Sequence, residues 1–226
     1  MFTCGPAFYQ TPAGGSTDPD YASVVLLLHG SDFLDYSPHA FVATTIGGGV
    51  TLDSSVPNGT VGNSCFRVTG VGTTTFQFPA VPEFKRSGAY TLEYWVYFDA
   101  VASNNLAMCS NFGAKFVQFT NGSPFSNVGA QGYSPNAPNS VTIGAWHQIT
   151  MAFDGSNYGQ FFDGVSIFTG AFALPPDASD QDMDVISALG TGGQHRMMEI
   201  RYTQGVCRYN PLGTTVPVQT APWPDS

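Results

Sequence analysis

Near its C-terminus the chain reads Met198-Glu199-Ile200-Arg201-Tyr202-Thr203-Gln204-Gly205-Val206-Cys207-Arg208-Tyr209, and it closes on Thr220-Ala221-Pro222-Trp223-Pro224-Asp225-Ser226. The first stretch begins with alternating apolar and polar residues, the period-two pattern of a β-strand with one face against a core. A Gly-Val-x-Arg-Tyr turn ends this strand, and a proline-rich tail follows. We expect the tail to act as a clasp that buries the ring of Trp223 against the domain.

Two segments further upstream carry the strongest strand signals. In residues 89–99, apolar and aromatic side chains occur on both faces, which predicts a strand in the middle of a sheet with cover on each side. Residues 158–162 and 165–169 flank Asp163-Gly164, and an Asp-Gly pair between β-rich arms is the strongest short-range signal for a hairpin. Both signals indicate an antiparallel sheet with tight turns.

The rest of the sequence is a succession of short strand patterns separated by turns. We expect further strands at residues 23–29, 41–46, 50–52, 64–69, 73–78, 115–120, 126–130, 146–154, 184–188 and 197–203. Residues 47–49 are predicted to form a turn, and residues 131–140 and 175–184 to form loops. No helical periodicity extends beyond about two turns. The predicted fold class is therefore all-β, an antiparallel β-sandwich.

Four further motifs accompany the C-terminal stretch. They are Ser23-Val24-Val25-Leu26-Leu27-Leu28-His29, Gly62-Asn63-Ser64-Cys65-Phe66, Tyr90-Thr91-Leu92-Glu93-Tyr94-Trp95-Val96, and Gly144-Ala145-Trp146-His147-Gln148-Ile149 followed by Phe162-Asp163-Gly164-Val165. Together the five motifs resemble the laminin-G-like, concanavalin A-like jelly-roll domains in virion proteins of tailed phages. The resemblance covers residues 21–226 and implies one jelly-roll domain. Residues 1–20 fall outside it and are expected to form an extended N-terminal arm.

The resemblance also implies a function. It favours a non-enzymatic virion structural protein of a tailed phage, as a capsid decoration, fibre or tail component, assembled in the host cytoplasm. The alternative is a carbohydrate-binding module for receptor recognition at the phage tail, and a third reading is a glycoside hydrolase, because this fold hosts all three. The implied partners are other virion proteins, host surface glycans and further copies of the same chain.

Composition excludes several classes of protein. Aromatic residues make up 14% and charged residues 10% of the 226 residues, which argues against disorder. The net charge is −9 and the seven Lys and Arg residues are scattered, so we expect no nucleic-acid binding. The longest aliphatic run, residues 24–28, is too short to span a bilayer, so we expect no membrane insertion.

The N-terminus and the cysteines indicate the compartment. Met-Phe-Thr-Cys-Gly-Pro has neither a basic nor an apolar signal region, so we expect no signal peptide. The four cysteines contain no CxxC pair, which disfavours a zinc site, and a core of this size needs no disulfides. Free, mostly buried thiols are expected, in keeping with assembly in a reducing cytoplasm.

Two groups of aspartates are alternative calcium candidates, because calcium takes six to eight hard oxygen ligands. One group lies in the acidic loop and comprises Asp177, Asp180, Asp182 and Asp184. The other, Asp32 and Asp35, follows the opening strand, where the resemblance implies a metal at the rim of the sandwich. The competing interpretations are a solvated acidic loop for the first group and turn-forming side chains for the second.

The sequence offers no catalytic motif. Glycosidases on this fold carry paired carboxylates on one strand face, whereas the three glutamates of this chain are far apart and no Gly-x-Ser-x-Gly is present. No catalytic residues are therefore predicted. For glycan or partner contact the candidates are Tyr133 and Tyr158, two rings at predicted rim positions, since sugar faces stack on aromatic rings. The alternative for both is ordinary core or hairpin packing.

Overall fold

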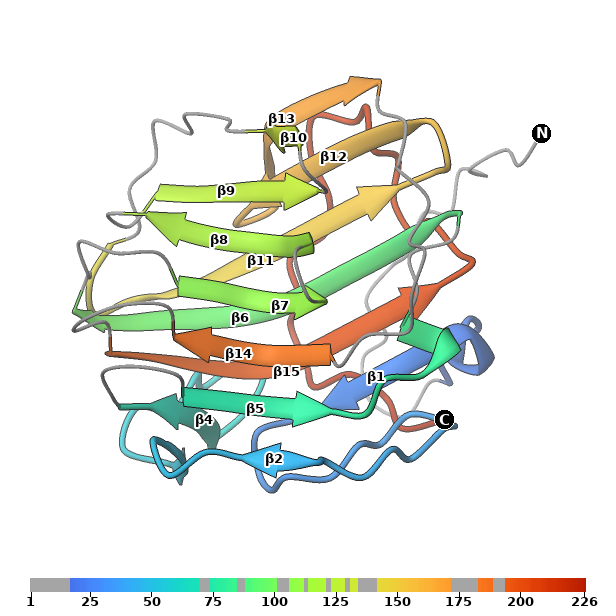
Figure 1. Ribbon diagram of the computed structural model, residues 1–226. Coiled ribbons are helices and arrows are strands. Elements are labelled where there is room, and N and C mark those ends of the chain that lie inside the picture. The colour runs from blue at the N-terminus through green and yellow to red at the C-terminus, as the bar shows by residue number, and fades with distance from the viewer. Residues whose placement is uncertain are drawn as a thin grey trace.

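The computed structural model describes the backbone of residues 17–69, 74–84, 88–100, 106–111, 114–120, 123–128, 131–133, 142–171, 183–188 and 194–226. Side chains are described for residues 17–69, 76–84, 88–100, 142–171 and 194–226, together with Met183 and Val185. Within these residues the chain forms two antiparallel β-sheets that pack face to face (Figure 1). The all-β sandwich predicted from the sequence is therefore confirmed.

The larger sheet has eight strands and the smaller one seven. The larger is ordered β13 (Val165–Ala171), β12 (Asn157–Phe162), β11 (Trp146–Phe153), β6 (Tyr90–Ala100), β15 (Gln194–Gln204), β4 (Cys65–Val68) and β3 (Val50–Asp53), with β1 (Val24–Leu28) also paired to β15. The smaller is ordered β10 (Gln131–Tyr133), β9 (Ser123–Val128), β8 (Ala114–Thr120), β7 (Leu106–Asn111), β14 (Met183–Ala188), β5 (Thr74–Phe78) and β2 (Thr45–Ile46). Two short 3-10 turns, Tyr21–Ser23 and Pro82–Phe84, are the only helical segments in the described residues, and neither is long enough to cross a membrane.

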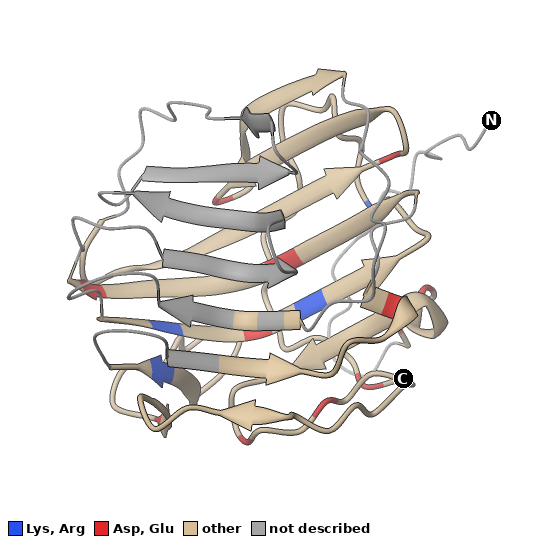
Figure 2. Ribbon diagram, in the orientation of Figure 1, with Lys and Arg blue, Asp and Glu red and all other residues tan. Residues whose placement is uncertain are grey.

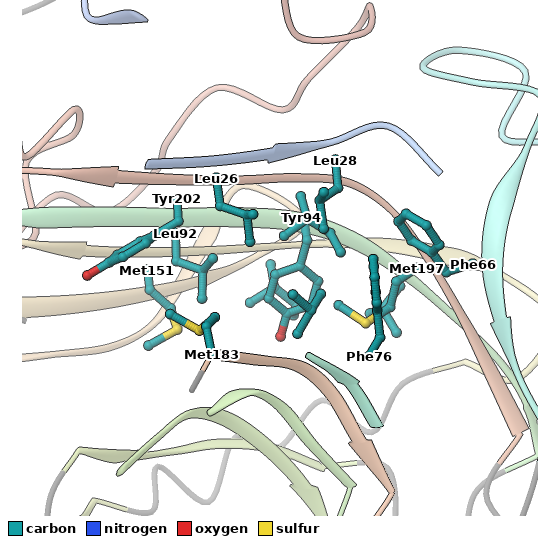
Figure 3. Packing of buried hydrophobic residues seen from close by; sticks show 14 of the residues in the cluster. Leu26, Leu28, Phe66, Phe76, Leu92, Tyr94, Met151, Met183, Met197 and Tyr202 are labelled. Carbon is teal, nitrogen blue, oxygen red and sulfur yellow. The ribbon is translucent and has the colours of Figure 1, made fainter. Parts of the chain in front are cut away.

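The hydrophobic core lies between the two sheets. Alternate residues of β6, from Tyr90 to Phe98, point into it, and Figure 3 shows Leu92 and Tyr94 directed toward Met183 of β14 and Phe76 of β5. The opposite face of β6 is largely buried as well. This agrees with the prediction, made from aromatic residues on both faces, of a mid-sheet strand covered on each side. Each fully buried Phe, Leu or Met side chain contributes about 1.5–3 kcal/mol to the free energy of unfolding.

The Asp163-Gly164 hairpin is present as predicted. It joins β12 to β13 with Phe162 opposite Val165, and both turn residues have positive φ, +48° for Asp163 and +76° for Gly164. This is the combination that a type I′ turn requires, and its twist matches that of the flanking strands.

A β-bulge in β15 lets two strands share one of its edges. β4 pairs with residues 195–197 and β1 with residues 200–203, and the register shifts between Met198 and Arg201. Glu199, at the bulge, has φ +51°, a left-handed conformation that costs a non-glycine residue of order 1–3 kcal/mol. Its backbone N–H donates to the carbonyl of His29, at the end of β1 (3.4 Å).

The turn predicted at residues 47–49 is present, with the Val50 N–H donating to the Gly47 carbonyl at 2.9 Å, and the strands on either side of it lie in different sheets. Three local predictions differ from the structure. The strand predicted at residues 41–46 is limited to β2 (Thr45–Ile46). The predicted loop 131–140 begins with a strand, β10. Residues 17–20, assigned to the arm, are part of the packed domain, since Asp18 is only 8% exposed. Residues 1–16 lie outside the described residues.

Candidate functional site

The face of the eight-stranded sheet that points away from the core carries a buried ion network at one end. Glu93 and Arg201 lie opposite each other on β6 and β15, with Arg201 Nη2 donating to Glu93 Oε2 at 2.6 Å. Arg208 donates two 2.8 Å hydrogen bonds to Asp18, which also accepts from Arg201 at 3.1 Å. Burial alone would raise the pKa of Asp18, but hydrogen bonding to Arg208 and the charges of Arg208 and Arg201 lower it. This network fastens residues 17–20 and the start of the C-terminal tail (residues 205–226) to the sheet.

Glu199 holds the end of the tail. One carboxylate oxygen pairs with His29 Nδ1 at 2.8 Å, and the other accepts hydrogen bonds from the backbone N–H of Trp223 (2.8 Å) and from Gln219 (3.2 Å). The guanidinium of Arg201 lies 3.5 Å from the centre of the Trp223 ring, a cation–π contact. The tail is therefore held against the domain as predicted, but the Trp223 ring is half-buried and not buried as expected.

Beside the tail, the same face carries a small apolar cluster. Val61, Cys65, Trp95 and Met198 are buried together, and Trp146 packs against them. Trp95 Nε1 donates to Gln219 of the tail at 2.8 Å. This cluster supports the neighbouring part of the outer face from below. The tail contacts described above do not extend over that part.

On that remaining part, five residues from five strands form a straight row, which we call the outer-face row: Thr51, Arg67, Arg196, Tyr97 and Trp146. Each is the direct cross-strand partner of the next, across β3, β4, β15, β6 and β11. Directly opposed residues have Cβ atoms roughly 4.5–5.5 Å apart, so their side chains make one continuous surface. Thr51 is exposed, and Tyr97 and Trp146 are half-buried.

Two carboxylates flank the arginines of the row. Arg196 donates from Nη1 to Asp99 and from Nε to Asp53 Oδ2 at 3.3 Å, while Arg67 Nε lies 3.6 Å from Asp53. Figure 2 shows basic segments on β4 and β15 near an acidic segment at the end of β6. Hydrogen bonds from Ser55 and the charge of Arg196 lower the pKa of Asp53. The charged groups of the row therefore form a compensated cluster of two cations and two anions.

The aromatic end of the row is a pair of rings. The centroids of Tyr97 and Trp146 are 5.5 Å apart with the planes inclined by 54°, and the guanidinium of Arg196 lies 5.2 Å from the Tyr97 centroid. Gly144, with φ +82°, brings the loop before β11 beside the Tyr97 hydroxyl, and its N–H donates to the Phe98 carbonyl at 3.0 Å. The ring pair is thus fixed by packing and by backbone contacts rather than held on a free loop.

Three polar atoms beneath this surface are buried from solvent and lack a hydrogen-bond partner among the described residues: Arg67 Nε, Asp99 Oδ2 and Trp146 Nε1. Arg67 Nε nevertheless lies 3.6 Å from Asp53, and Asp99 accepts from Arg196 through its other oxygen. A ligand on the outer face would therefore contact the rings of Tyr97 and Trp146 rather than these atoms.

The aspartates predicted after the opening strand hold their own loop. Asp35 is buried and accepts four hydrogen bonds, from the backbone N–H groups of Leu27, Ser37 and Phe41 and from the Ser37 hydroxyl. Asp32 accepts from the N–H of Leu34 and from the hydroxyl of Tyr36. These are the turn-forming roles that stood as the alternative to calcium binding.

The other predicted site residues lie elsewhere. Tyr158 is 2% exposed and belongs to the hydrophobic core, so it cannot offer its ring to a glycan; the prediction for this residue is wrong, because it lies on the inner face of β12. Tyr133 is in β10 and Asp184 in β14, but their side chains, like Asp177, Asp180 and Asp182, lie outside the described residues. No group of three or more potential metal ligands occurs in the described part of the chain. Calcium binding in the acidic loop stays a prediction.

The outer-face row was not predicted. In the sequence its two arginines are far apart, and only the pairing of β4 with β15 joins them. The available signal was the alternation within β6, which places Trp95 and Tyr97 on the same face as Glu93, away from the core.

Comparison with known families identifies the chain. It belongs to the laminin G-type family of the concanavalin A-like lectin/glucanases superfamily, whose model matches residues 70–197, more than half of the 226 residues. A comparison with curated protein sequences finds no match. The laminin-G-like, concanavalin A-like jelly roll implied by the sequence motifs is therefore confirmed.

Solved structures share this fold at low sequence identity. The binding domain of Paraclostridial Mosquitocidal Protein 1 aligns with a TM-score of 0.66 and 10% identity over 84% of this chain and 50% of that chain. A structure of botulinum neurotoxin type C, whose cell entry depends on two ganglioside molecules, gives 0.59 and 13% over 81% and 48%. Trypanosoma rangeli sialidase in complex with sialic acid gives 0.61 and 16% over 91% and 34%. The chain spans about half the length of the two toxin structures.

Proposed function

We propose that this domain is a carbohydrate-binding module that binds sugar at the outer-face row and has no catalytic role. The observation that carries the proposal is the Tyr97–Trp146 ring pair, half-buried and fixed beside arginine and aspartate side chains on the outer face of the sheet. The apolar C–H face of a sugar ring packs on an aromatic ring, and its hydroxyl groups pair with planar charged side chains.

Rigidity supports binding at this place. Trp146 packs on the apolar cluster of Val61, Cys65, Trp95 and Met198, and Arg196 is held by Asp53 and Asp99. Side chains already fixed in one conformation lose little entropy when a ligand binds. A site on paired strands is also held in place more firmly than one on loops.

The matched structures support a binding role over a catalytic one. The mosquitocidal protein match is a binding domain, and the neurotoxin match is a protein that interacts with gangliosides. The sialidase match covers only 34% of the enzyme. In this chain, two of the three glutamates, Glu93 and Glu199, are buried under the tail in ion pairs and hydrogen bonds. A general acid or nucleophile must instead face the scissile bond.

The biological setting stays a prediction. The sequence motifs resemble virion proteins of tailed phages, whereas neither the description of the matched family nor the three structures compared above refer to virion proteins. In that setting the module would display its row on the particle surface, contact other virion proteins through its termini, and bind host surface glycans. Localisation in the virion and assembly into homo-oligomers belong to the same proposal.

Glycan-array binding with matched variants tests the proposed function. Trp146→Ala should reduce binding about tenfold or more, because stacking on an aromatic ring contributes about 1–3 kcal/mol, and Trp146→Phe should keep part of it. Tyr36→Ala is the control, since Tyr36 is also half-buried but contacts His29 and Asp32 away from the row. Equal binding by wild type and Trp146→Ala, or release of reducing ends from the bound glycans, would contradict the proposal.

A further inference from the structure

We infer that the outer-face row recognises a neutral glycan and discriminates against sialylated, uronic or sulfated ones; this rests on the proposed function. Analogy with proteins that bind gangliosides or sialic acid would point the other way. The inference depends on three observations: the pairing of the arginines, the partly exposed carboxylate of Asp99, and the charge of the whole chain.

The arginines of the row are already engaged by carboxylates. Arg196 is 5% exposed in its side chain, and its Nε, Nη1 and Nη2 atoms all face Asp53 or Asp99, with Nη2 at 3.2 Å from Asp53. Arg67 is 37% exposed, but its Nε also lies 3.6 Å from Asp53. An anionic sugar would have to draw a guanidinium away from its carboxylate, and separating a partly buried ion pair leaves the other charge uncompensated.

Asp99 opposes an anion at one end of the row. Its side chain is 24% exposed. A carboxylate or sulfate on the sugar would place negative charge against this carboxylate, whereas a neutral sugar meets no such repulsion.

The whole chain adds a weaker effect in the same direction. Its net charge is −9 and its isoelectric point about 4.5. A net negative molecule slows the approach of anions and disfavours their binding, and salt screens this repulsion over about 10 Å at 0.1 M. The balanced charge of the row leaves no local positive field to overcome it.

The test is an array of glycan pairs that share one neutral core and differ by a terminal sialic acid or a sulfate group. We expect the neutral member of a pair to bind about tenfold or more tightly. Affinity for the neutral member should change less than about twofold between roughly 0.05 and 0.5 M NaCl, since no net charge is neutralised. Tighter binding of the acidic member, weakening with salt, would overturn the inference.

Variants separate this inference from the proposed function. Asp99→Asn keeps an acceptor but removes one of the two negative charges that compensate Arg67 and Arg196, so the preference should move toward acidic glycans, with unfolding curves checking that the variant is folded. An unchanged preference would contradict the charge argument. If the protein prefers acidic glycans and Trp146→Ala abolishes their binding, the proposed function stands and the inference is wrong. Absence of binding to every glycan pair would contradict the proposed function itself.

Discussion

At the scale of single residues, His29 joins the opening strand to the end of the chain. Its Nδ1 lies 2.8 Å from Glu199 and its Nε2 2.7 Å from Asp225. Burial alone would lower the pKa of His29, but hydrogen bonding and charge interaction with the two carboxylates raise it to about 9. The imidazolium is thus the folded-state form at neutral pH, and it links the tail to β1.

The pH dependence of stability follows from this pKa. Folding binds the proton of His29 more tightly, so its stabilisation is fully present below about pH 6.5 and is lost as pH rises through about 9. The loss should be on the order of 2–3 kcal/mol. Urea unfolding of wild type and His29→Gln between about pH 6 and pH 9 measures it, and the variant should show the flatter profile.

A second buried histidine, His195, has to be distinguished from His29 in this experiment. Burial lowers the pKa of His195 to about 4, against the charge of Asp99. Its contribution to stability is present above about pH 6.5 and is lost as pH falls toward about 4, so the loss expected above pH 6.5 comes from His29 and not from His195. If wild type and His29→Gln lose stability equally above pH 6.5, the ion pairs of His29 do not hold the tail.

The sequence predicted the roles of some single residues and not of others. The turn-forming role of Asp35 was one of two alternatives, because a local Asx turn needs only neighbouring residues. Tyr158 was placed wrongly, because the inner and outer faces of β12 follow from its pairing with β11, in which Tyr158 lies opposite Phe153. The sequence therefore predicted roles that depend on neighbouring residues, but it did not predict which face of β12 points into the core.

At the scale of elements, the tail lies close against the sheet at β12. A Cβ atom built on Gly159 would lie 2.2 Å from the carbonyl oxygen of Pro211 and 2.8 Å from its Cα. Both are backbone atoms, so the contact cannot be relieved by moving a side chain. Only glycine lets the tail lie this close to the strand.

Gly159→Ala should therefore push the tail away and destabilise the domain by about 1–3 kcal/mol. Gly48→Ala is the matched control, because a Cβ there meets nothing within 4 Å and its φ is not in the left-handed region. The control should be neutral or slightly stabilising, through the reduced entropy of the unfolded chain. Thermal unfolding compares the two; equal melting temperatures would mean that the tail is not held against β12.

The elements themselves were largely predictable. The central strands β6 and β11 and the Asp163-Gly164 hairpin followed from period-two patterns and turn chemistry. The separation of β2 and β3 into different sheets could not be predicted in this way. Residues 47–49 indicate only a turn, and the partner of each strand is set by long-range packing. The outer-face row depends on four such pairings and was beyond local patterns for the same reason.

At the scale of the whole molecule, a buried thiol lies outside the inter-sheet core, in the apolar cluster on the outer face of the larger sheet. Cys65 is free and fully buried, its Sγ donating to the carbonyl of Asp53 at 3.2 Å. Burial, together with the nearby charge of Asp53, raises the pKa of this thiol to about 12. Since the thiolate is the reactive form, Cys65 should be inert in the folded protein.

Alkylation of Cys65 therefore reports how often the apolar cluster on this outer face becomes exposed, by local opening or by unfolding. At pH 8 the folded protein should react far more slowly at Cys65 than in urea, and mass spectrometry of the peptide that contains Cys65 measures the rate. The rate should rise as stability falls, so Gly159→Ala should react faster than wild type and Gly48→Ala should not. Because Cys65 lies under Trp146 and Trp95, a glycan bound at the outer-face row should slow the reaction further. Rapid labelling of the folded wild type would mean that this face opens locally, and the apolar cluster beneath the row would then not be rigid.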